Sequence, residues 1–169
     1  MRVFTLRHEL NCDESTYWSK IAFSDDFNQW LYLQKLMFAA YRPESSQDDG
    51  ETLVRRVYIE PSIDQLPAPI QKLMGSRVGY TEDGVFDRRT RVYKFHSIPQ
   101  AMADKVSIMG EQSCVNTGDG KLVRETQMRI NVQVFGIGKM IEQRICDDST
   151  GTLDASAALT NEYLKANSL

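Results

Sequence analysis

The chain has 169 residues, of which 41% are hydrophobic and 25% charged, as is ordinary for a globular protein. Its formal net charge of −3 argues against a broad basic surface for nucleic acid. No run of about 18 apolar residues is present, which excludes a conventional transmembrane helix. We therefore expect one domain over residues 1–169, with no nucleic-acid partner.

The cysteines, Cys12, Cys114 and Cys146, are far apart and form no CxxC pair. This spacing predicts neither a disulfide framework nor a structural zinc site, and we expect reduced thiols, no metal and no cofactor. The sequence begins MRVFTLRHEL, which lacks the apolar core of a signal peptide. The expected compartment is therefore cytoplasmic.

The N-terminal part predicts one strand and two short helices. Apolar and polar residues alternate over residues 3–10, which is typical of a strand with one buried face. Asp13 and Ser24 then stand where a side-chain oxygen can cap a helix. Tyr17 and Trp18 belong to the apolar side of the first helix.

The middle of the chain predicts an antiparallel meander. Its strand-like segments are residues 38–44, 52–60, 77–86, 92–98 and 105–115. Turn-forming residues separate several of them, at 47–50, 87–90 and 116–120. Consecutive hairpins of this kind place neighbouring strands side by side.

Residues 61–75 are too long and too apolar for a hairpin loop. Leu66, Ile70 and Leu73 recur at helical spacing, so we expect a short amphipathic helix over residues 66–74. Two roles for it stay open, which are compatible: a plug for one end of the sheet, and a lid over a ligand. Its apolar side chains also suggest transient contact with a membrane surface.

The last third predicts a long strand and a long helix. Alternation continues from Leu122 to Val134, and residues 135–138 form a glycine corner. Helical spacing then runs from about Gly138 to Lys165, roughly 40 Å at ~1.5 Å per residue. The two glycines of the corner lack the full GxGxxG pattern, so they predict a tight turn and not a phosphate-binding loop.

These elements predict an α+β fold in which a curved, seven-stranded antiparallel sheet is wrapped around the C-terminal helix. The inward stripe of that helix includes the small residues Thr152, Ala155 and Ser156. Small side chains facing a concave sheet leave space, so we expect a cavity for a small apolar molecule.

Several motifs resemble the START-like (SRPBCC, helix-grip) superfamily, and more narrowly a mainly bacterial family of unknown function within it. The matching segments are LRHE (6–9), LPAPI (66–70), YTEDGVF (80–86), residues 98–99, 103–105 and 110, FGIG (135–138) and residues 156–164. The resemblance implies a helix-grip fold with a hydrophobic-ligand pocket. It implies no particular reaction, although some members of the superfamily are polyketide cyclases.

Alternation and helical spacing select the candidate ligand-binding residues. They are Tyr58, Leu66, Ile70, Tyr80, Phe86, Ile108, Met128, Ile130, Ile145, Thr152 and Leu153. The possible polar anchors are Glu82, His96 and Arg124.

Two of the polar candidates, Glu82 and Arg124, each have two interpretations. Glu82 either faces solvent or is a buried acid with a partner such as Arg124. Arg124 interrupts the apolar face of its strand, and it either reaches solvent at the end of the cavity or anchors a ligand headgroup. His8, on the apolar face of the first strand, is expected to be a core or hydrogen-bonded histidine.

Three functions follow from these expectations. The first is binding, and possibly transfer, of a lipid or other hydrophobic small molecule. The second is a cyclase- or hydratase-like enzyme acting in the same cavity with Glu82, Tyr93 and His96. The third is an interaction domain with a solid core and no cavity.

Overall fold

The computed structural model describes residues 1–62 and 78–169. Within them, seven strands form one antiparallel sheet in the order β1-β7-β6-β5-β4-β3-β2. The strands are β1 (Arg2–Leu10), β2 (Ala40–Asp48), β3 (Thr52–Glu60), β4 (Tyr80–Asp87), β5 (Val92–Pro99), β6 (Val106–Gly118) and β7 (Lys121–Val132). The predicted seven-stranded α+β fold is therefore confirmed.

Two short helical pairs follow β1. Helix α1 (Glu14–Thr16) continues into the π-helical segment η1 (Tyr17–Ala22), and α2 (Asp25–Gln29) continues into η2 (Trp30–Lys35). The predicted caps are both present: Thr16 N donates to Asp13 Oδ1 at 2.7 Å, and Phe27 N donates to Ser24 Oγ at 3.3 Å.

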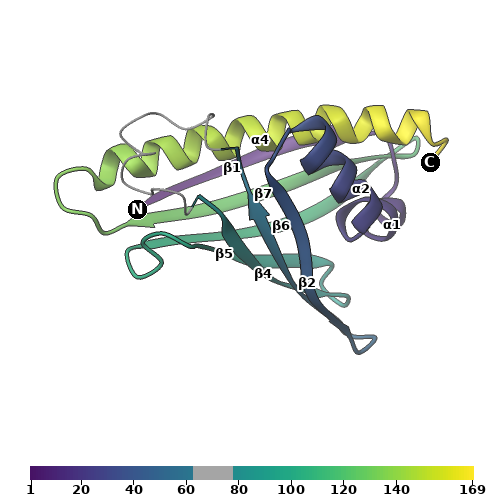
Figure 1. The fold of residues 1–169 in the computed structure, drawn as a ribbon. Coiled ribbons are helices and arrows are strands. Elements are labelled where there is room, and N and C mark those ends of the chain that lie inside the picture. Colours follow the sequence, from purple (N-terminus) through teal and green to yellow (C-terminus); the bar gives the residue numbers. More distant parts are fainter. Residues whose placement is uncertain (63–77) are drawn as a thin grey trace.

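Helix α4 (Gly138–Ala166) is the longest element of the described chain, as the sequence predicts. It runs along the β1 and β7 side of the sheet, with which it is in contact (Figure 1). Strands β2 to β5 turn away from it at a steep angle, and helices α1 and α2 lie near its C-terminal end. The twisted sheet therefore has a concave face that α4 covers.

Both ends of α4 are attached to the sheet. Near its N-terminus the buried carboxylate of Glu142 accepts a hydrogen bond from Val132 N at 3.0 Å. Near its C-terminus the Asn161 amide donates to Glu9 O at 3.1 Å and accepts from Asn11 N at 2.8 Å. These contacts fix the helix across the length of β1 and β7.

An aromatic cluster packs beneath η1 on the concave face. Here Trp18 packs on Phe86 with ring centroids 4.5 Å apart, and Phe23 packs on the same ring at 5.1 Å. Leu10 and Leu122, both fully buried, belong to the same cluster. This cluster attaches η1 to the sheet.

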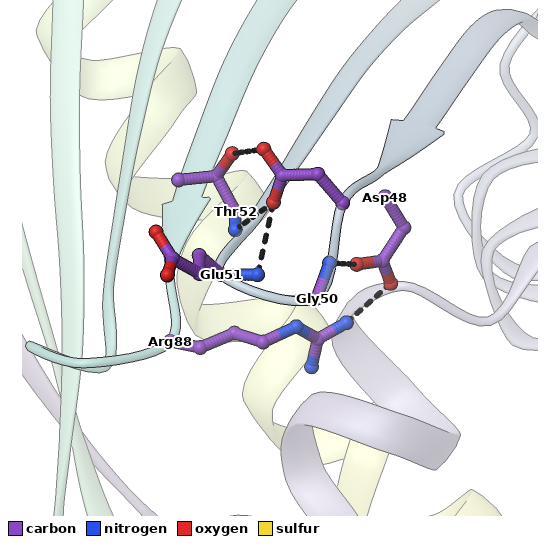
Figure 2. A network of polar contacts seen from close by, with 6 residues as sticks. Asp48, Gly50, Glu51, Thr52 and Arg88 are labelled. Atoms are coloured by element: carbon purple, nitrogen blue, oxygen red, sulfur yellow. Dashed lines mark hydrogen bonds and ion pairs between the residues drawn. The ribbon is translucent and has the colours of Figure 1, made fainter.

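The predicted turn between β2 and β3 is confirmed and is held by two aspartates (Figure 2). Asp49 Oδ1 accepts from the backbone N–H groups of Glu51 and Thr52, at 2.9 and 2.6 Å. Asp48 pairs with Arg88 from the next hairpin, so the two turns are joined.

Several strand boundaries differ from the predicted ones. Strand β2 covers residues 40–48 instead of 38–44, and a bulge between Pro43 and Ser45 lets this edge strand continue past its proline. Among the described residues, strand β4 begins at Tyr80, β6 continues to Gly118, and β7 ends at Val132 instead of Val134.

Candidate functional site

A cavity of about 320 Å³ lies between the concave face of the sheet and α4. Residues from β3 to β7, from η1, α2 and η2, and from α4 line it, and most of their side chains are apolar or aromatic. Its volume falls at the lower end of the range for small-molecule sites, about 300–1,000 Å³. A molecule larger than benzene therefore has room inside.

The middle of α4 forms one wall of this cavity. Ser149, Thr152, Leu153 and Ser156 all line it, and three of these four side chains are small. A larger aliphatic residue at those positions would fill the space that the sheet leaves. Thr152 and Ser156 of the predicted stripe of small residues thus line the cavity, and Ala155 does not.

The structure brings most of the described candidate residues together. Those that line the cavity are Tyr80, Ile108, Met128, Ile145, Thr152 and Leu153, together with the possible anchors Glu82 and Arg124. Their contact with a ligand stays a proposal.

Tyr58 is not among the lining residues. The prediction for it is wrong, because Tyr58 lies on the opposite face of β3 from the cavity. Arg55 and Ile59 line the cavity, so the alternation of the strand turns Tyr58 to the other face. There Arg42 lies over its ring at 4.2 Å, and the hydroxyl donates to Glu60 at 2.7 Å.

Phe86 and Ile130 lie on the predicted face of the sheet but do not line the cavity. Phe86 belongs to the aromatic cluster under η1. Ile130 is fully buried in a second cluster with Val106 and Ile141. Alternation predicts the face of a residue and gives no information on how far along the face the cavity extends.

His96 also lies outside the lining, on the opposite face of β5 from Phe95 and Ser97, which line the cavity. Its role as an anchor inside the cavity is therefore wrong. Leu66, Ile70 and the predicted helix over 66–74 lie within residues 63–77, outside the described residues. The lid and membrane roles stay predictions.

Glu82 is a carboxylic acid that lines the cavity, and its hydrogen-bond partner is not the predicted one. Its Oε1 accepts a hydrogen bond from the Tyr93 hydroxyl at 2.8 Å. Burial raises the pKa of Glu82, and the charge of Arg55 and the hydrogen bond from Tyr93 act in the opposite direction. Burial and the nearby Glu82 also raise the pKa of Tyr93, so its hydroxyl stays protonated and donates.

Gly84 makes this hydrogen bond possible. A Cβ atom at this position would lie 1.9 Å from the Tyr93 hydroxyl oxygen, far inside contact distance. The side chain of Tyr93 crosses the space that a residue larger than glycine would occupy, and so reaches Glu82 two positions along β4.

Arg55 was not among the sequence candidates. It lines the cavity, donates to the Tyr41 hydroxyl at 2.9 Å and donates to Ala22 O at 3.1 Å. Its charge also acts on Glu82. One signal for it exists in the sequence, because Arg55 shares its strand face with Val57 and Ile59.

Arg124 is buried, with 3% of its surface exposed, so the prediction that it reaches solvent is wrong. One terminal nitrogen donates to His8 Nδ1 and to Leu153 O, both at 3.2 Å. Because a guanidinium only donates, His8 Nδ1 accepts and its Nε2–H donates to Asp154 at 2.9 Å. A chain of contacts thus connects the cavity with an exposed carboxylate.

Neither a metal site nor a membrane span is found in the described part of the chain. No group of three or more His, Cys, Asp or Glu side chains gathers at metal-binding distance among residues 1–62 and 78–169. No helix of the same residues has the length and hydropathy to cross a bilayer.

The fold resembles solved structures at low sequence identity. Norcoclaurine synthase from Thalictrum flavum shares 17% identity with a TM-score of 0.62, over 94% of this chain and 85% of that one. The Zhui aromatase/cyclase from Streptomyces sp. R1128 shares 12% with a TM-score of 0.59, over 96% and 95%. The protein TTHA0849 from Thermus thermophilus shares 12% with a TM-score of 0.68, over 99% and 100%.

At these identities the likeness shows the helix-grip fold alone. No curated protein matches the sequence significantly. A family model described as "Protein of unknown function (DUF2505)" matches residues 21–164, which is most of the chain.

Proposed function

Since the chain belongs to the DUF2505 family of unknown function, we propose its function from the site: it binds a hydrophobic small molecule between the sheet and α4. The observation that carries this proposal is the cavity of about 320 Å³. A solid-core interaction domain would have this space filled. Transfer of each CH₂ group of a ligand from water into such a site contributes about 0.8 kcal/mol.

The wall residues support the proposal. Met128 and Ile108 face the cavity from adjacent strands, and Ile145 and Leu153 face it from α4. An apolar ligand would lie between these two layers. Because polar groups are also present, the site can orient a ligand as well as bury it.

The test has two parts. Native mass spectrometry of the purified protein asks whether a small molecule co-purifies. Titration with the uncharged fluorescent probe N-phenyl-1-naphthylamine then measures access to an apolar site. Binding of this probe with saturation at one site is expected, and the absence of both signals would contradict the proposal.

A matched pair of variants on α4 connects the binding to the cavity. Thr152→Phe inserts a ring where the side chain lines the cavity, and Ala158→Phe inserts the same ring on the exposed side of the helix. We expect the first variant to lose probe affinity and the second to keep it. Equal probe affinity in the two variants would show that the probe binds outside the cavity.

A second candidate function is acid–base catalysis on the bound molecule, in the manner of a cyclase or hydratase. The observation that favours it is Glu82, whose pKa is raised inside the cavity and which Tyr93 contacts directly. A carboxyl group with a raised pKa can act as a general acid near neutral pH. The likeness to norcoclaurine synthase and to an aromatase/cyclase adds support only at the level of the fold.

Glu82→Gln separates the two candidates, because glutamine keeps the acceptor for Tyr93 and removes the proton donor. An enzyme would lose turnover by about 10²–10⁴-fold and keep its ligand affinity. A binding protein would show no turnover before or after the substitution.

Transfer of the ligand between membranes would require contact with a lipid surface as well. The sequence of residues 66–74 favours such contact, with Leu66, Ile70 and Met74 beside Lys72. Co-sedimentation with anionic vesicles at low salt measures it. If the protein stays in the supernatant, the transfer role is wrong.

A further inference from the structure

The guanidinium of Arg124 is a buried cation that the protein leaves partly unsatisfied. Its Nε is fully buried and has no hydrogen-bond partner, although Arg124 lines the cavity. Among the described residues it makes no ion pair with any carboxylate, and its partners are the His8 ring, the Leu153 carbonyl and the Tyr17 hydroxyl. An arginine side chain stays charged in proteins, so this charge cannot be removed by losing a proton.

The charges around the cavity do not balance. Among the described residues that line it, the charged side chains are Arg55, Glu82, Arg124 and the pair Arg144–Asp148. Glu82 faces Arg55, and Asp148 faces Arg144. Arg124 is therefore the cation among these residues that faces no carboxylate in the cavity lining.

The other ionisable groups near Arg124 are either neutral or already bonded to other residues. Burial raises the pKa of Tyr17 to about 12 and that of Cys114 to about 12, so neither supplies a negative charge near neutral pH. Asp154 is reached only through His8 and its side chain is 60% exposed to solvent. Glu14 is paired with Arg91 at 2.8 Å, and its other carboxylate oxygen accepts from Trp18 Nε1.

A second donor near Arg124 also lacks a partner. The hydroxyl of Thr126, two residues further along the same face of β7, is fully buried with no hydrogen bond. Gln112, opposite Thr126 on β6, lines the cavity and accepts from the Tyr17 hydroxyl at 3.2 Å. Thr126 does not itself line the cavity, whereas Arg124 and Gln112 do. Buried polar groups without partners are rare and costly, so the Nε of Arg124 is a donor at this end of the cavity whose acceptor is not among the described residues.

We infer that the cavity takes an amphipathic carboxylic acid, whose carboxylate binds Arg124 and whose apolar part lies against Met128, Ile108 and α4. This inference rests on the proposed function. A singly charged carboxylate balances the excess charge, and it accepts from the planar guanidinium through short, charge-assisted hydrogen bonds.

His8 is a positioning residue in this arrangement. Its Nδ1 accepts a hydrogen bond from one terminal nitrogen of Arg124. On the other side of the ring, Nε2 donates to Asp154, and this contact fixes the ring. The carboxylate therefore meets a group whose orientation is already fixed, which lowers the entropy cost of binding.

The test compares three ligands with the same ten-carbon chain: decanoate, 1-decanol and decylamine. Isothermal titration calorimetry at neutral pH is run on the wild-type protein and on R124M, R124K and R129M. Arg129 is an exposed residue of the same strand, so R129M controls for the loss of a charge alone.

In the wild-type protein, decanoate is expected to bind at least about tenfold more tightly than decanol, and decylamine more weakly than both. R124M should lose this preference while its affinity for decanol stays within about threefold. R124K should keep part of the preference, and R129M all of it.

The outcomes separate this inference from the proposed function. If decanol binds the wild-type protein as tightly as decanoate does, the inference is overturned and the hydrophobic site stands. If R124M keeps the preference for decanoate, the carboxylate binds elsewhere and the inference is again overturned. If none of the three ligands binds and N-phenyl-1-naphthylamine does not bind either, the proposed function itself fails. Should R124M not fold, the wild-type comparison decides alone.

Discussion

Arg55 and Arg124 both bring a cation to the same cavity, and their surroundings differ. Arg55 has a hydroxyl, a carbonyl and the charge of Glu82 for partners. Arg124 has a histidine, a carbonyl, a tyrosine hydroxyl and an Nε without a partner. The first is part of a network that the protein completes by itself, and the second has capacity left for a ligand. We therefore expect Arg55 to act on stability and Arg124 to act on binding.

The largest effect is expected from Arg55→Met. This change removes two hydrogen bonds from a charged group and leaves Glu82 without its cation, so the free energy of unfolding should fall by about 3 kcal/mol. Urea unfolding at pH 7 measures it.

The matched change Arg124→Met should alter the free energy of unfolding by no more than about 1 kcal/mol, because it also removes the cost of burying an unbalanced charge. Equal losses in the two variants would show that Arg124 is structural, and the distinction between the two arginines would fail.

Gly84→Ala should weaken the network around Glu82 without touching any charge. The new methyl group would lie 1.9 Å from the Tyr93 hydroxyl oxygen, so the ring must move and its bond to Glu82 must break or lengthen. Overpacking of this kind costs about 1–3 kcal/mol. Thermal unfolding measures the loss, and an unchanged midpoint would mean that Tyr93 has room to turn aside.

Glu82→Gln should change how stability depends on pH. The pKa of Glu82 is raised in the folded protein, so the folded state binds more protons than the unfolded one between the two pKa values. Stability from this group is therefore present below the unfolded pKa and is lost as pH rises toward the folded pKa, at up to about 1.4 kcal/mol per pH unit.

The difference in unfolding free energy between E82Q and wild type should accordingly grow in favour of E82Q between pH 4 and pH 7. Urea titrations at three pH values in that interval provide the measurement. A difference that is independent of pH would contradict the raised pKa of Glu82.

The smallest effect is expected from Gly151→Ala. Gly151 lies in the middle of α4 on its exposed side, and a Cβ atom there would meet nothing within 4 Å. The change should stabilise the protein by up to about 1 kcal/mol through helix propensity alone. It also serves as the control for Gly84→Ala, since the same methyl group is added where space is available.

The fold could be predicted from the sequence because its signals are local. Alternation along β7 and helical spacing along α4 follow from which residues face a core, and Asp13 and Ser24 cap through contacts three residues away. The turn between β2 and β3 is equally local.

The site could be predicted only in part, since it depends on contacts across the chain. In β3, apolar residues and an arginine occur on both faces, so alternation did not separate Tyr58 from Ile59. The partner of Glu82 is Tyr93, which reaches it only because Gly84 on β4 leaves room. A pattern in one strand contains no such information.

Finally, the two attachments of α4 have a consequence for exchange kinetics. Glu142 holds one end to Val132 and Asn161 holds the other to Glu9 and Asn11. A helix secured at both ends cannot swing outward as a unit without breaking buried or paired hydrogen bonds at one of them. On the proposed function, a ligand would therefore enter and leave while α4 stays in place, and the amides of α4 should remain protected from deuterium on the timescale of ligand exchange.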